Sequence, residues 1–73
     1  MSDDIEELIR MANQIATFFQ AYPEEEAVNG TAEHIRDFWT SAMRARLDRY
    51  VADNGKGLHP LVTRAVGHLQ QAA

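Results

Sequence analysis

The chain has 73 residues, a net charge of −4 and no cysteine. A chain of this length forms at most one domain, which we predict over residues 1–73. A domain of about 60 residues buries only about 60% of the surface that its unfolded form exposes. Domains of this size often gain stability from a disulfide, a metal or a partner. Without cysteine neither a disulfide nor a thiolate metal site can form, so a protein partner is the source that remains.

The net negative charge also argues against some classes of binding partner. Binding to nucleic acid depends on neutralising phosphates with Lys and Arg, so a negative chain is poorly suited to it. No apolar run approaches the roughly 20 residues of a membrane span, and the acidic start of the chain is unlike the basic start of a signal peptide. We therefore expect a cytoplasmic protein with neither a nucleic-acid nor a membrane partner.

The first helix is predicted over residues 3–21. Its N-cap is expected from Ser2, Asp3 or Asp4. Asp3 with Glu6 has the spacing of a capping box, and Pro23 disfavours helical geometry at Tyr22, which ends the helix.

This first helix carries more apolar side chains than one core face requires. One stripe, predicted for the core, consists of Ile5, Leu8, Ile9, Ala12, Ile15, Ala16 and Phe19. A second seam runs beside it through Met11, Ile15, Phe18 and Tyr22. Together they span an arc of roughly 180°, wider than the usual stripe of about 100°. One seam should enter the core, and the other must be covered by another helix or by a partner.

The second helix is predicted over residues 23–39, with Pro23 as its first residue and three glutamates in its first turn. Its apolar residues keep helical spacing: Ala27, Val28, Ala32, Ile35, Phe38 and Trp39. Asn29-Gly30 conflicts with this pattern, because the dipeptide favours a hairpin between strands and a helical Gly costs about 1 kcal/mol. No alternating pattern surrounds it, so we predict one helix and leave open whether it breaks at Gly30.

Two shorter helices complete the prediction, over residues 41–54 and 60–71. Thr40 is a natural N-cap for the third helix, Asn54-Gly55 is a good stop, and Pro60 opens the fourth. The fold class is all-α, a small domain of three to four short helices. Its core is predicted to include Ile5, Leu8, Ala12, Ile35, Leu47, Val51, Leu61, Ala65 and Leu69.

The sequence offers no constellation for catalysis, cofactor binding or metal binding. His34, His59 and His68 share no metal-ligand spacing, and no nucleophile is paired with a base. We therefore predict no catalytic, cofactor-binding or metal-binding residue. One alternative is a small carrier protein modified at Ser41, although Thr40-Ser41-Ala42-Met43 replaces the Asp-Ser-Leu of such carriers.

Partner binding is predicted from two groups of side chains. The large apolar residues of the second seam, with Trp39, suit either a core or an interface. Three arginines form the basic cluster of the chain, and Asp48 and Asp53 stand four residues after two of them, which favours salt bridges within the helix. The alternative is a docking patch. The candidate partner-binding residues are Met11, Phe18, Tyr22, Trp39, Arg44, Arg46 and Arg49.

Several blocks of the sequence resemble one family, the delta subunit of NAD-dependent formate dehydrogenase. The resemblance covers nearly the whole chain and lies in Arg10-Met11-Ala12-Asn13-Gln14-Ile15-Ala16, Phe18-Phe19, Pro23, Glu25-Glu26-Ala27-Val28, His34, Phe38-Trp39-Thr40, Met43-Arg44, Gly57-Leu58 and Pro60-Leu61-Val62. There are two departures. Ser41 stands where the family often has Pro, and His59 stands where it often has Ser.

The resemblance implies a non-catalytic subunit whose partner is the large catalytic (alpha) subunit of a soluble formate dehydrogenase. In that family the partner subunits carry the molybdenum or tungsten pterin, iron–sulfur clusters and FMN, and this chain carries no cofactor. Its role would be to aid assembly, cofactor insertion or stability of the alpha subunit. The isolated chain is expected to be able to self-associate. A generic helical protein-interaction module and a helix-turn-helix that uses the arginines are the remaining alternatives.

Overall fold

The first helix, α1 (Ile5–Phe19), is one of the two longest helices of a four-helix domain. The structure, a computed structural model, describes residues 4–72. The carboxylate of Asp4 caps α1 by accepting a hydrogen bond from the backbone N–H of Glu6 at 3.1 Å. Asp3, expected to form a capping box, lies outside the described residues. The helix ends two residues earlier than predicted, with Gln20 as its C-cap.

The second helix, α2 (Glu24–Phe38), passes through Gly30 without a break. No strand occurs in residues 4–72, so the hairpin signal of Asn29-Gly30 is overridden. Pro23 is the N-cap and not the first helical residue, because its extended backbone (ψ 149°) lies outside the helical range. Glutamates 24–26 occupy the first turn, where the helix dipole favours negative charge.

The third and fourth helices follow the predicted boundaries closely. The Thr40 hydroxyl caps α3 (Ser41–Asp53) by accepting from the backbone N–H of Met43 at 3.1 Å. At its other end Gly55 takes a positive φ of 65°, and its N–H donates to the carbonyl of Tyr50 at 3.0 Å, which satisfies a carbonyl at the end of the helix. The chain then turns into α4 (Pro60–Ala72), and the predicted all-α class is confirmed.

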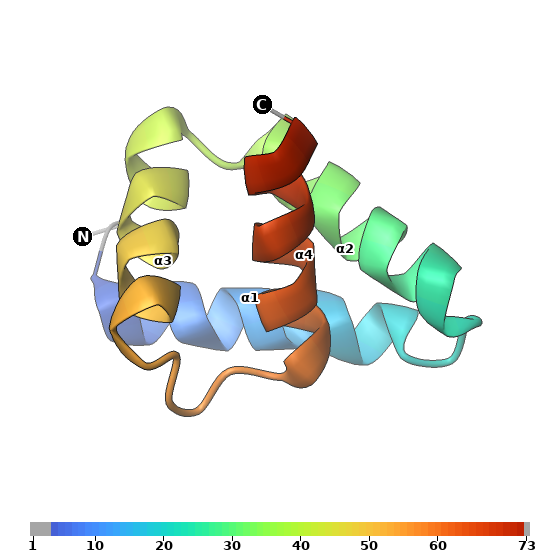
Figure 1. The fold of residues 1–73 in the computed structure, drawn as a ribbon. Coiled ribbons are helices and arrows are strands. Elements are labelled where there is room, and N and C mark those ends of the chain that lie inside the picture. Colours follow the sequence, from blue (N-terminus) through green and yellow to red (C-terminus); the bar gives the residue numbers. More distant parts are fainter. Residues whose placement is uncertain (1–3, 73) are drawn as a thin grey trace.

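The four helices enclose one hydrophobic core. Figure 1 shows α3 and α4 running across α1, with α2 beside them, and α2 packs most extensively against α4. The buried side chains are Leu8, Ala12, Ala16, Ala27, Thr31, Ala32, Ile35, Trp39, Leu47, Leu61, Val62, Ala65 and Val66. Six of the nine predicted core residues are among them, and the other three (Ile5, Val51 and Leu69) pack half-buried against the core. Within residues 4–72 no helix is long and apolar enough to cross a membrane.

Asn13 of α1 makes two hydrogen bonds to the backbone of the loop between α3 and α4. Its amide nitrogen donates to the carbonyl of Gly57 at 2.9 Å, and its amide oxygen accepts from the backbone N–H of His59 at 2.8 Å. Tyr50 adds a third contact, from its hydroxyl to the carbonyl of Lys56 at 2.6 Å. These bonds satisfy backbone groups that the loop leaves outside any helix.

His59 performs the capping role expected of a serine at the start of α4. Its Nδ1 accepts a hydrogen bond from the backbone N–H of Leu61 at 3.1 Å. Since Nδ1 accepts, Nε2 carries the proton and donates to the side-chain oxygen of Gln20, also at 3.1 Å. The substitution of His for Ser therefore keeps the cap and adds a contact to the end of α1.

We predict that Asn13→Ala lowers the free energy of unfolding by about 1–2 kcal/mol, because two hydrogen bonds are lost and one backbone donor is left partly buried. Chemical denaturation measures the change. Gln14→Ala is the matched control, since Gln14 is the exposed next residue of α1. Equal stability of the two variants would show that the loop does not depend on Asn13.

Candidate interaction site

The second apolar seam of α1 is covered at one end and open at the other. Met11 and Ile15 are half-buried and pack against the core. Phe18 is 66% exposed and Tyr22, just beyond the helix, is 47% exposed. The part of the seam that lacks a covering helix is therefore its C-terminal part.

The open end of the seam is a cluster of aromatic rings. Phe18 meets Phe19 edge to face, with ring centroids 5.0 Å apart and planes at 88°. Tyr22 lies 5.7 Å from Phe19 and 6.2 Å from Phe18. All three distances fall in the range in which aromatic pairs attract, which adds about 0.5–1.5 kcal/mol per pair beyond area burial. The rings thus hold one another in place although two of them face solvent.

Helix α2 extends this cluster. His34 stacks on Phe38 with ring centroids 4.7 Å apart, and Phe38 is 74% exposed. His34 also lines a pocket of about 280 Å³ with Ile15, Phe18 and Phe19, so the two helices contribute to one surface. We call the aromatic surface the set Ile15, Phe18, Phe19, Tyr22, His34 and Phe38.

Phe38 and Trp39, both placed on the apolar face of the second helix by their spacing, differ in burial in the structure. Phe38, placed with the inward stripe of the second helix by the sequence, points to solvent. Trp39 is only 6% exposed and belongs to the core. Phe38 is the last residue of α2, whereas Trp39 is its C-cap and has an extended backbone (φ −97°, ψ 144°). Trp39, a candidate partner-binding residue, is thus unavailable on the free surface, and partner binding by the others stays a prediction.

The three arginines do not gather at the rim of the aromatic surface. Arg46 and Arg49 line a pocket of about 350 Å³ with Ile5, at the opposite end of α1 from Phe18. That separation is about 20 Å along the helix at about 1.5 Å per residue. Arg44 faces another direction again, into the space between α2, α3 and α4.

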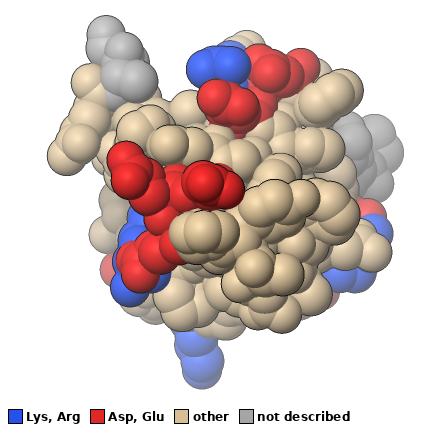
Figure 2. Space-filling model, turned by 90° about the vertical axis from the view of Figure 1, so that its right-hand side faces the viewer, with Lys and Arg blue, Asp and Glu red and all other residues tan. Residues whose placement is uncertain are grey.

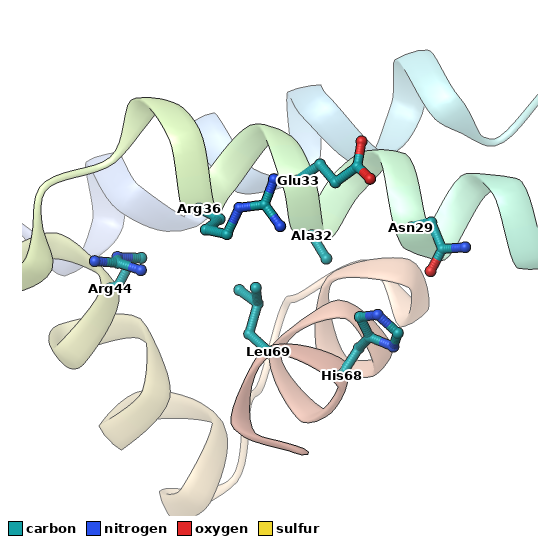
Figure 3. Close-up of a pocket in the computed structure, with 7 residues that line it drawn as sticks. All are labelled: Asn29, Ala32, Glu33, Arg36, Arg44, His68 and Leu69. Carbon is teal, nitrogen blue, oxygen red and sulfur yellow. The ribbon is translucent and has the colours of Figure 1, made fainter. Parts of the chain in front are cut away.

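Figure 3 shows the pocket that Arg44 lines, which has a volume of about 280 Å³. Arg44 reaches it from α3, Arg36 and Glu33 from α2, and His68 from α4. The Nε of Arg44 is buried without a hydrogen-bond partner, whereas Arg36 pairs with Asp37 at 3.0 Å. The predicted pairs of Arg44 with Asp48 and of Arg49 with Asp53 are not among the three salt bridges of residues 4–72, which are Arg10–Glu7, Arg36–Asp37 and Arg64–Glu24.

Asp48 lies in a partly buried position on α3. Burial raises the pKa of its carboxyl above the usual value, and the positive charge of Arg44 offsets this only in part. The folded state therefore favours protonated Asp48. This contribution to stability is complete below the pKa of the unfolded chain and is lost as the pH rises through the higher pKa of the folded protein.

We predict that Asp48→Asn raises the melting temperature at pH 7, because the amide avoids the cost of the partly buried charge. At pH 3 the variant and the wild type should melt at the same temperature, since Asp48 is then mostly protonated in both states. Thermal unfolding followed by circular dichroism at the two pH values measures this. The same shift at both pH values would assign the effect to packing of the amide instead.

Other chemistry-bearing residues are scattered. In the described part of the chain no group of three or more His, Cys, Asp or Glu side chains could hold a metal ion. His34 is stacked on Phe38, His59 is hydrogen-bonded in the cap, and His68 is exposed on α4. Ser41 is exposed as the first residue of α3, and the carrier alternative stays a prediction.

Gly30 explains how α1 and α2 approach closely enough to share the aromatic surface. A Cβ at this position would be 2.6 Å from Cδ1 of Phe19 and still closer to its Cε1. The ring of Phe19 therefore occupies the space that any other residue at position 30 would fill. In the sequence, Asn29-Gly30 favours a turn while the surrounding apolar spacing favours a helix. The structure shows that glycine is accommodated in the helix at this position because the ring of Phe19 packs against it.

We predict opposite effects for the two helical glycines. Gly30→Ala should lower the free energy of unfolding by about 1 kcal/mol, because displacing Phe19 forfeits part of the roughly 1.5–3 kcal/mol gained by burying such a ring. Gly67→Ala should raise it by about 0.5–1 kcal/mol, since a Cβ at Gly67 meets nothing within 4 Å. Urea denaturation compares the pair, and equal stabilisation of both would mean that Phe19 moves aside at no cost.

The fold and this surface define a small all-α protein that presents an aromatic patch between its first two helices. The chain belongs to the family of NADH-dependent formate dehydrogenase delta subunits, FdsD, whose sequence profile matches residues 7–66. The resemblance found in the sequence is thereby confirmed. Comparison with curated proteins and with solved structures gives no significant match.

Proposed function

We propose that the chain is a non-catalytic small subunit of a soluble, cytoplasmic formate dehydrogenase. It binds the large catalytic subunit and promotes assembly, cofactor insertion or stability of that subunit. The observation that carries the proposal is the open aromatic surface on a member of the delta-subunit family. Exposed contiguous apolar patches mark interaction sites in small proteins, and a chain of this size gains stability from such an interface.

The redox cofactors belong to the partner subunits in this proposal. Iron–sulfur clusters are held by cysteine thiolates, and this chain has none. Its residues therefore do not fit a cluster. The molybdenum or tungsten pterin and FMN are likewise assigned to the larger subunits, where the chemistry on formate and NAD takes place. The contribution of this chain is to bind and to stabilise.

The test is to purify formate dehydrogenase from the native host with and without the gene for this chain. We expect mass spectrometry to find the chain with the large subunit, and we expect its deletion to reduce the metal and pterin content or the thermal stability of that subunit. The purified chain alone should not oxidise formate. Its intact mass also tests the carrier alternative, which requires added mass at Ser41.

Restoring the gene on a plasmid is the control for indirect effects of the deletion. A complex that forms without the chain and has full cofactor content and stability would contradict the proposal.

A further inference from the structure

The aromatic surface has an acidic border on one side. Glu26 is exposed and falls four residues before Gly30, eight before His34 and twelve before Phe38, which places it beside the ridge of α2 that carries His34 and Phe38. Asp37, exposed on the same side as Glu26, is paired with Arg36, whereas Glu26 forms no salt bridge within residues 4–72. Figure 2, viewed from the side where α1 turns into α2, shows acidic side chains beside a broad area without charged residues.

From this arrangement we infer that the aromatic surface docks onto a patch of the large subunit that is apolar at its centre and bordered by Lys or Arg. The inference rests on the proposed function and specifies the surface and the chemistry of the partner. The aromatic rings supply the buried contact area, and Glu26 supplies the unpaired charge that a basic border complements.

Charge argues against the other occupants of this surface. Anionic lipid headgroups and nucleic-acid phosphates would be repelled by the acidic border. A second copy of the chain would bring the same acidic border and another net charge of −4, so self-association accumulates like charges instead of neutralising them. A partner protein with positive charges at the border is the occupant that satisfies both the rings and Glu26.

Position also separates this surface from the arginines of α3. Arg46 and Arg49 lie over Ile5 at the other end of α1, so they cannot contact the same partner patch as Phe18 and Phe38 unless the interface spans the length of the helix. Replacing them therefore leaves the proposed contact intact. They provide a test of whether binding is specific to the aromatic surface.

The first experiment measures binding of the purified chain to formate dehydrogenase isolated from cells that lack it. Phe18→Ser with Phe38→Ser should weaken binding by at least about 30-fold, the factor that corresponds to loss of one interface hot spot of about 2 kcal/mol. Both side chains are largely exposed, so the fold should survive, and circular dichroism checks that it does. Arg46→Ser with Arg49→Ser tests the competing prediction that these arginines bind the partner, and under the present inference this variant should bind as the wild type does.

The second experiment compares two neighbouring glutamates. Glu26→Lys should slow association several-fold at low ionic strength, and the difference should vanish near about 1 M salt, where the screening length is about 3 Å. Glu25→Lys makes the same charge change in the same helical turn. Glu25, however, lines a pocket with Val28 and His68 on the side of α4, so its replacement should have a much smaller effect.

The outcomes separate the inference from the proposed function. A wild-type chain that does not bind the complex overturns both. Normal binding by the serine double variant overturns the docking surface and leaves the function standing. Equal effects of Glu25→Lys and Glu26→Lys overturn the basic border, since only net charge would then matter. If the serine variant loses only self-association of the isolated chain, the surface is a homodimer contact and the inference is wrong.

Discussion

The contact between Phe19 and Gly30 sets the distance between α1 and α2, and the candidate surface depends on that distance. Because Gly30 has no side chain, the ring of Phe19 lies directly against the backbone of α2. One helical turn further along, His34 then meets Ile15 and Phe18 across the same seam. A larger residue at position 30 would push the helices apart and separate the two halves of the aromatic surface. The helical penalty of glycine, about 1 kcal/mol, is offset by this close packing.

The large side chains of α1 and α2 are divided between core and surface. Trp39 closes the core as the C-cap of α2, whereas Phe38, the last helical residue, faces solvent. On α1, Leu8, Ala12 and Ala16 form the fully buried face. Ala12 and Ala16 are small, which allows the other helices to approach closely at these positions. The larger residues of α1 lie toward its edge, where Phe18 is left without a cover.

Sequence periodicity was sufficient for the helices and most of the core. Caps such as Thr40 and stops such as Asn54-Gly55 act locally, so their effect is readable from the neighbouring residues alone. One helix through Gly30 was predicted correctly, with a possible break left open, and the structure shows no break. The packing of Phe19 against this glycine was not readable from the neighbouring residues.

The candidate site shows the same limit. The second seam of α1 identified Phe18 and Tyr22, but the contribution of His34 and Phe38 depends on how α2 is rotated against α1. The arginines were proposed for the rim of the seam because they cluster in the sequence of the third helix. Their true positions, at Ile5 for two of them and between α2 and α4 for Arg44, depend on the placement of α3, which no local pattern specifies.

The order of the elements along the chain has a consequence for synthesis. α2 packs most extensively against α4, and α4 follows α1, α2 and α3 along the chain. A ribosome that has released only α1 to α3 therefore holds a chain whose α2 still lacks its main packing partner, so the core closes only after α4 emerges. The aromatic surface, in contrast, is built entirely from α1, α2 and the turn between them. The residues that we assign to partner recognition are thus translated before the helix that completes the core.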